Sequence, residues 1–97
     1  MAFRIDISPD AQEHLAGLRK FDQVRIVDAI EAQLTNEPRK PSRNRKPMRS
    51  NLIATWELRI SNFRVYYDVE QQTVFVRAIG VKHRDRVTIG DEEVELS

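Results

Sequence analysis

The chain has 97 residues, of which 40% are hydrophobic and 32% charged, and its formal net charge is +1. These values are typical of one small folded domain, placed here at residues 1–97, and no apolar run approaches the ~18 residues of a membrane helix. The chain has no cysteine and only two histidines, so we expect no metal and no cofactor. The first residues lack the apolar centre of a signal peptide, so a cytoplasmic protein is expected.

A strand and two helices are predicted in the N-terminal third. Residues 3–7 alternate apolar and polar, as a short strand does. The tripeptide S-P-D at 8–10 indicates a helix start, with serine as the cap and proline in the first turn. A second amphipathic helix is expected with Asp22 as its N-cap and apolar residues recurring to Leu34. It must end before Pro38, and the two helices form an antiparallel hairpin.

A long loop and a series of strands are predicted for the rest of the chain. Residues 38–51 contain three prolines and no periodicity, which indicates a loop. From Leu52 the apolar residues alternate with polar ones, and the strands are expected at 52–60, 63–69 and 74–79. A short V-T-I run and an acidic tail follow. The tail is expected to be an edge strand, a cover over the basic face or a frayed end. The order of elements predicts an α+β domain, with the helical hairpin packed on one face of an antiparallel sheet.

The strand register raises the first functional question. A two-residue turn at S-N places Arg59 opposite Arg64, although like charges on paired strands repel each other. A turn at 70–73 places Tyr66 opposite Arg77 and brings a third arginine onto the same uncovered face. Three arginines on one surface are suited to an anion, because guanidinium groups bind phosphate bidentately. The alternative is a solvated face whose charges nearby carboxylates neutralise.

The charge is unevenly distributed along the chain. Residues 39–64 contain eight basic residues and one acid, Glu57. Such a field, beside a tyrosine that could stack on a base, favours nucleic acid as the ligand. The predicted nucleic-acid-binding residues are Lys46, Arg49, Arg59, Tyr66, Arg77, Lys82, Arg86, Arg43 and Arg45.

Four segments together resemble a known family. They read S-P-D-A-Q-E-H-L, R-K-P-M-R, W-E-L-R-I-S-N-F-R-V-Y-Y-D-V and A-I-G-V-K-H-R. In this order they are similar to the RelE/ParE superfamily of bacterial toxins from type II toxin–antitoxin pairs, over nearly the whole chain. The resemblance implies an α+β fold and a cognate antitoxin that wraps the toxin and blocks its basic surface. RelE-like members cleave messenger RNA on the ribosome, whereas ParE-like members poison DNA gyrase and are not nucleases.

The resemblance carries over to particular positions. Arg64 matches the family's phosphate-binding arginine, and Lys46 matches a lysine that commonly precedes the strands. Residues 82–86 form the C-terminal basic segment, in which the nucleases have catalytic arginine or histidine. The chain departs from the nucleases at Thr55 and Glu57, where some of them have two lysines. It also lacks a tyrosine in V-T-I-G.

Cleavage of this class uses the 2′-hydroxyl as the nucleophile on the adjacent phosphate. Stabilising the charge on that phosphate is assigned to Arg64 and Arg84. Proton transfer is assigned to His83 and Glu57. His14 is expected to be exposed and without a role.

Three functions follow from these features. The leading hypothesis is a toxin that acts as a ribosome-dependent mRNA endoribonuclease, whose partners are the antitoxin, the ribosome and mRNA. The alternatives are a ParE-like inhibitor of DNA gyrase without nuclease activity, and an inactive module of the same fold that binds nucleic acid or protein. No membrane partner is expected.

Overall fold

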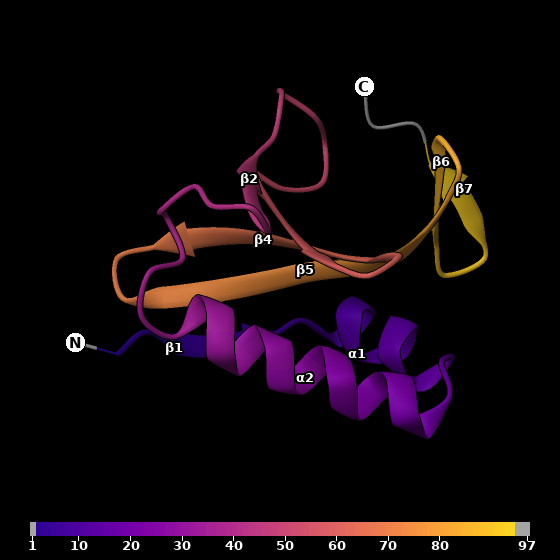
Figure 1. Ribbon diagram of the computed structural model, residues 1–97, viewed down its shortest axis with the longest axis horizontal. Helices are drawn as coiled ribbons and strands as arrows, with labels where there is room; N and C mark the ends of the chain where they lie inside the picture. Colours follow the sequence, from indigo (N-terminus) through magenta and orange to yellow (C-terminus); the bar gives the residue numbers. More distant parts are fainter. Residues whose placement is uncertain (1, 95–97) are drawn as a thin grey trace.

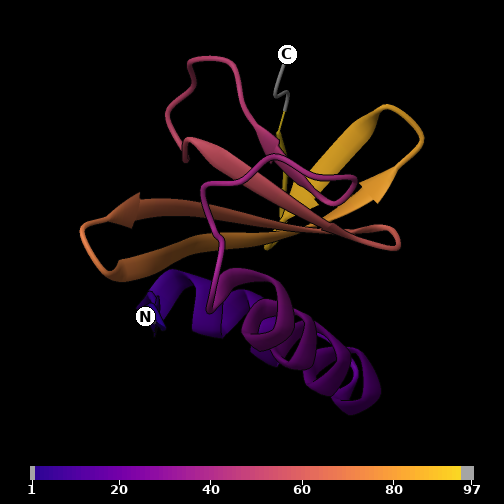
Figure 2. The ribbon, with the colours of Figure 1, turned by 60° about the vertical axis from the view of Figure 1, so that its left-hand side comes forward.

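The computed structural model describes residues 2–94 and places two helices against one face of a seven-stranded sheet (Figures 1 and 2). The helices are α1 (Pro9–Ala16) and α2 (Lys20–Leu34). The strands are β1 (Arg4–Ile7), β2 (Arg45–Pro47), β3 (Trp56–Ile60), β4 (Phe63–Glu70), β5 (Thr73–His83), β6 (Arg86–Ile89) and β7 (Glu92–Val94). The predicted α+β fold is confirmed. Neither helix of the described chain has the length and hydropathy needed to cross a bilayer.

The sheet is built around the long strand β5. The strands run in the order β2-β3-β4-β5-β6-β7, and each neighbouring pair is antiparallel. Strand β1 lies off this path and pairs in parallel with the first half of β5. The second half of β5 pairs instead with β6 and curves away from the helices with the β6–β7 hairpin (Figure 1).

The start of α1 agrees with the prediction from the sequence, and the start of α2 differs from it. Ser8 caps α1, because its Oγ accepts the Ala11 N–H (3.1 Å) and donates to the Arg77 carbonyl of β5 (3.1 Å). The prediction of Asp22 as the second N-cap is wrong. The N-cap of α2 is Arg19, whose side chain makes no capping bond. Asp22 lies in the first turn, where its carboxylate binds Arg19 (3.3 Å) and still faces the positive end of the helix dipole.

The main core lies between the helices and the sheet. Tyr67 of β4 is wholly buried there, stacks on Trp56 with ring centroids 6.1 Å apart, and donates its hydroxyl to the Pro38 carbonyl (2.8 Å). The buried side chains of this core are Ala11, Leu15, Ile26, Ile30, Leu34, Leu58, Phe63, Val65, Tyr67, Val74, Val76 and Ile79. The expected division of the strands into a core face and an outer face is therefore correct for β3 and β4.

Two strand boundaries differ from the prediction. The predicted loop at 38–51 contains strand β2, which is too short to show a period. Residues 52–55 are not a strand, although they continue the alternating pattern. The Asn51 carboxamide closes a turn there, and its Oδ1 accepts the N–H groups of Ile53 (2.7 Å) and Ala54 (3.0 Å). Pairing of β3 consequently begins only at Trp56.

The register between β4 and β5 also departs from the expected one. The pairs predicted across the S-N turn are all confirmed. Between Tyr66 and Tyr67, however, the register shifts by one residue: Tyr67 pairs with Val76, whereas Tyr66 pairs with Ala78. The prediction that Tyr66 faces Arg77 is wrong, because Arg77 is the extra residue of a β-bulge.

The bulge creates a second apolar cluster on the face that was expected to be uncovered. Its buried members are Ala54, Tyr66, Ala78 and Val87. Strand β7 pairs with β6, so the acidic tail is an edge strand as far as Val94. The rest of the tail lies outside the described residues.

Gly80 allows β5 and β6 to approach closely at this cluster. A Cβ at Gly80 would lie 2.7 Å from Cγ1 of Val87 and 3.3 Å from the Tyr66 ring. We expect Gly80→Ala to lower the free energy of unfolding by about 1–3 kcal/mol, because the buried neighbours must shift. Urea unfolding measures this. Gly17→Ala is the control, since the nearest atom to its Cβ would lie at 3.5 Å. Equal stability of the two variants would contradict the crowding at Gly80.

Candidate nucleic-acid interface

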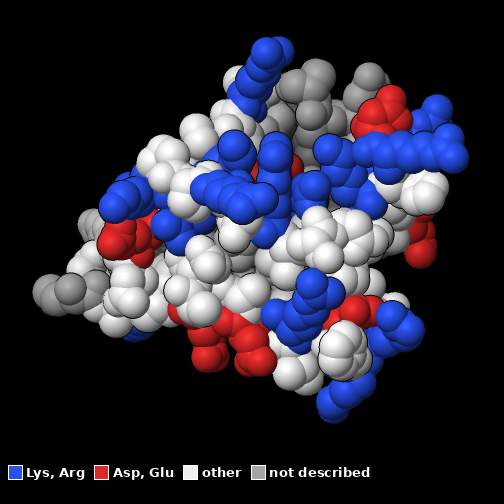
Figure 3. Space-filling view, viewed as in Figure 1, with Lys and Arg blue, Asp and Glu red and all other residues white. Residues whose placement is uncertain are grey.

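A hollow of about 290 Å³ lies on the sheet face opposite the helices. Four cations line it, from β2, the following loop, β3 and β5: Lys46, Arg49, Arg59 and Lys82. Glu57 and Tyr66 also line it, and these six residues define the basic hollow. Figure 3 shows the Lys and Arg side chains as a band across the sheet side of the molecule. The positive charge of the site therefore comes from segments that are far apart in the sequence.

A single carboxylate lies between the two arginines that face each other on β3 and β4. Glu57 Oε2 accepts the Arg59 Nε–H (2.9 Å), and its Oε1 lies 3.9 Å from Arg64 Nε. This acid offsets the repulsion between the paired arginines. The Arg59 side chain is 44% exposed and that of Arg64 only 10%. Of the two, Arg59 is consequently the one that an incoming anion can reach.

Arg64 instead supports the β3–β4 turn from inside. Its guanidinium donates to the carbonyls of Ser61 (2.9 Å) and Phe63 (2.8 Å). Ser61 has a positive φ of 56°, a backbone conformation that is uncommon for residues other than glycine. Two charge-assisted hydrogen bonds thus hold the turn that fixes the register of the hollow.

Arg64→Ala is expected to lower the free energy of unfolding by about 2–4 kcal/mol, since the buried Phe63 carbonyl and the part-buried Ser61 carbonyl lose a charged donor. Arg59→Ala is the control and should cost no more than about 1 kcal/mol, as an exposed ion pair does. Urea unfolding of both variants measures the difference. Equal stability of the two variants would contradict this structural role of Arg64.

Tyr66 lies beneath the basic hollow, packed in the second apolar cluster. Its side chain is wholly buried, so the predicted stacking on a base is wrong. Its hydroxyl has no hydrogen-bond partner in the described chain. Burial, aided by the charge of Glu57, raises the pKa of Tyr66 to about 12. The hydroxyl thus remains a protonated donor at neutral pH, without a protein acceptor.

Arg77 is not part of the basic hollow. Its Nε lies 2.9 Å from Asp68 Oδ2, its Nη2 lies 3.6 Å from Glu70 Oε2, and its guanidinium lies 5.0 Å from the Phe75 ring centroid. The bulge is the reason, because it moves Arg77 out of register with Tyr66. The prediction that Arg59, Arg64 and Arg77 converge as free cations is wrong, since each has a carboxylate partner.

Because of the ion pair of Asp68, the free energy of unfolding depends on pH in the acid range. Burial acts to raise the pKa of Asp68, but hydrogen bonds from Thr55 and Arg77 outweigh it and lower the pKa below the ordinary value of 3.8. The group therefore stabilises the fold above about pH 4, and this contribution disappears as the pH falls through the lowered pKa. We expect Asp68→Asn to lose stability less steeply than the wild type between about pH 4 and pH 2, measured by unfolding at each pH.

The C-terminal basic segment is divided between two surfaces. Lys82 lines the basic hollow, whereas the next residue, His83, lines a groove on the other side, because neighbours on a strand point to opposite faces. Arg84 is exposed in the β5–β6 turn with a φ of 60°, and Arg86 pairs with Glu93 (3.1 Å). Among the four predicted catalytic residues, only Glu57 lies in the hollow.

Two other predicted cations lie apart from the hollow. Arg43 is exposed, and Arg45 donates to the Gln33 carbonyl and side chain and to the Lys40 carbonyl, which ties the loop to α2. Sequence reasoning missed Met48 and Asn51, which line the hollow. No motif marks them, because their position depends on the turn that the Asn51 side chain closes.

Comparison with known proteins agrees with this architecture. The family model for the ParE toxin of the type II toxin–antitoxin system parDE matches residues 5–87. The crystal structure of the toxin–antitoxin complex RelBE2 from Mycobacterium tuberculosis contains a chain of the same fold. It is 21% identical, with a TM-score of 0.73, and the match covers 84% of this chain and 100% of that one. No curated protein matches this chain.

Proposed function

This chain belongs to the ParE toxin family of type II toxin–antitoxin systems. From the chemistry of its basic hollow, and not from its family, we propose that it cleaves messenger RNA on the ribosome. The observation that carries the proposal is the basic hollow, which combines the cations Lys46, Arg49, Arg59 and Lys82 with the carboxylate of Glu57. Such a set fits the phosphate backbone of RNA and offers a base beside it. The antitoxin is the protein partner of the toxin.

Phosphate binding would rearrange one ion pair. Arg59 is nearly half exposed and binds Glu57 through Nε. An RNA phosphate between Lys46 and Lys82 offers this guanidinium a stronger, bidentate partner. When Arg59 turns to the phosphate, Glu57 Oε2 loses its closest cation and becomes available as a base. The substrate itself thereby activates the carboxylate.

The cleavage step then follows from groups in the hollow. Glu57 takes the proton of the 2′-hydroxyl, and the 2′-oxygen attacks the adjacent phosphorus. The bond from phosphorus to the 5′-oxygen breaks, and a lysine ammonium of the hollow returns a proton to that oxygen. The products are a 2′,3′-cyclic phosphate and a 5′-hydroxyl end. Arg59 and the other lysine of the hollow stabilise the charge that develops on the phosphate.

A second function has its own supporting observation. His83 and Arg84 lie outside the hollow, Arg64 is buried, and Glu57 is held by Arg59 in the free protein. A toxin whose proton-transfer groups are not assembled is suited to act by binding alone. The alternative is therefore ParE-like inhibition of DNA gyrase without cleavage.

One induction experiment separates the two functions. After expression of the toxin, we expect new 5′-hydroxyl ends inside translated messages and no activation of a DNA-damage reporter. Purified ribosomes programmed with mRNA should give the same ends in vitro. Intact mRNA with an active damage reporter would replace the proposal by gyrase inhibition. Normal growth with intact mRNA would indicate an inactive module of the fold.

A further inference from the structure

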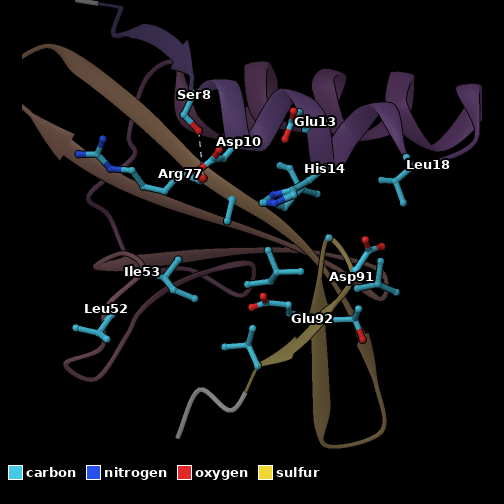
Figure 4. Close-up of a pocket in the computed structure, with 18 of the residues that line it drawn as sticks. Ser8, Asp10, Glu13, His14, Leu18, Leu52, Ile53, Arg77, Asp91 and Glu92 are labelled. Carbon is cyan, nitrogen blue, oxygen red and sulfur yellow. Dashed lines mark hydrogen bonds between the residues drawn. The ribbon is translucent and has the colours of Figure 1, made fainter.

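A second and larger depression lies between α1 and the β6–β7 hairpin (Figure 4). Its volume is about 1050 Å³, at the upper end of the range for pockets that hold one small molecule. Its floor is apolar and consists of Ile53, Ala78, Ile79, Val81, Ile89 and Val94. This space is suited to several side chains of a partner.

The rim of this depression carries acids on both walls. Asp10 and Glu13 project from α1, and Asp91 and Glu92 lie on the hairpin opposite (Figure 4). All four are exposed, and none forms an ion pair with any residue between 2 and 94. We name the depression with this rim the acidic groove. Four unpaired carboxylates around one apolar floor repel each other and attract cations.

The wall formed by α1 is fixed to the floor. The Ile79 N–H of β5 donates to His14 Nδ1 (3.2 Å). The expectation that His14 has no role is therefore wrong. Arg77 also lines the groove, but its charge is taken up by Asp68 and Glu70. The groove is thus largely formed in the free protein, and its negative rim is not offset by its own arginine.

We propose that the acidic groove docks a protein segment in which apolar side chains alternate with Lys or Arg. The apolar side chains cover the floor, and the cations meet the carboxylates on the two walls. Nucleic acid does not fit, because its phosphates would face the same four acids. Val81 and His83 face this groove while Lys82 faces the basic hollow, so the segment and RNA occupy different surfaces.

Designed peptides test the chemistry without RNA or ribosomes. The probe is a fluorescent 12-residue peptide of alternating Leu and Lys, and binding is followed by anisotropy at 150 mM salt. We expect the Leu–Lys peptide to bind at least tenfold more tightly than a Ser–Lys peptide, and a Leu–Glu peptide not to bind. Failure of the Leu–Lys peptide to bind, or equal binding of the Ser–Lys peptide, would overturn the proposal.

Charge reversal gives the sharper test. The double variant Glu13→Lys, Asp91→Lys should bind the Leu–Lys peptide at least tenfold more weakly and gain affinity for the Leu–Glu peptide. The neutral pair Glu13→Gln, Asp91→Asn should fall between these and the wild type. The control Lys46→Ala, Lys82→Ala alters only the basic hollow and should bind the peptide as the wild type does. The proposal is wrong if the reversed variant binds like the wild type, or if the control loses binding.

Discussion

Replacing Lys46 and Lys82 together by alanine is expected to abolish growth arrest and to slow mRNA cleavage by at least about 10³-fold. Both ammonium groups line the hollow in which the phosphate is proposed to bind. Their loss removes charge that stabilises both the bound RNA and the phosphate during cleavage. RNA binding should also become less dependent on salt, because fewer phosphate contacts remain. Cleavage of ribosome-bound mRNA and growth after induction measure the effect.

The matched control for this variant is Arg84→Ala, Arg86→Ala. It removes the same formal charge from exposed residues of the β5–β6 region that do not line the hollow. We expect the cleavage rate to fall by less than about tenfold, because salt screens the effect of these two charges on the hollow. If the control loses toxicity while the lysine variant keeps it, the active surface contains Arg84 and Arg86 of the C-terminal basic segment and not the hollow.

Glu57→Gln is expected to slow cleavage by about 10²–10⁴-fold, the usual contribution of a general base. The amide has nearly the shape of the carboxylate, so the variant should fold. RNA should bind more tightly, because the variant lacks the negative charge of Glu57 and leaves Arg59 free for phosphate. A carboxylate with a purely structural role would not change RNA binding and cleavage in opposite directions. Single-turnover cleavage and RNA affinity are the two measurements.

Asp68→Asn is the control for Glu57→Gln. Asp68 is also a carboxylate paired with an arginine of the sheet, at 2.9 Å, but it does not line the basic hollow. At neutral pH its variant should cleave and bind RNA as the wild type does. A Glu57→Gln protein that cleaves normally would place the base elsewhere. If the Glu57→Gln protein loses RNA binding and cleavage together, the main role of Glu57 is to hold Arg59 and Arg64 in place.

The two surfaces have opposite charge although they share strand β5. Lys82 contributes to the basic hollow, and its neighbours on the strand contribute to the acidic groove. The net charge of +1 conceals this separation. A protein segment in the groove and RNA in the hollow would each approach a surface of complementary charge. Association at either surface should therefore weaken with salt.

Several features of this protein could be read from the sequence because they depend on neighbouring residues. Ser8 caps its helix through the N–H three residues ahead. The S-N turn sets the pairing of β3 with β4, since a two-residue turn leaves only one register. The same local motifs carry the resemblance to the toxin family, and the family model confirms that resemblance. The grouping of helices on one side of the sheet follows from the order of these elements.

The tertiary structure alone decided which charged side chains meet. The bulge at Arg77 depends on how β5 packs between β4, β6 and α1. No pattern in V-F-V-R-A-I predicts this bulge. The burial of Tyr66 depends on Val87 and Ala54, which are distant in sequence and cover a face that alternation assigned to solvent. Alternation gives the side of the sheet on which a residue lies, but not what another segment places over that side. The convergence of Lys46 with Lys82 was fixed only when β2 and β5 came together through the sheet.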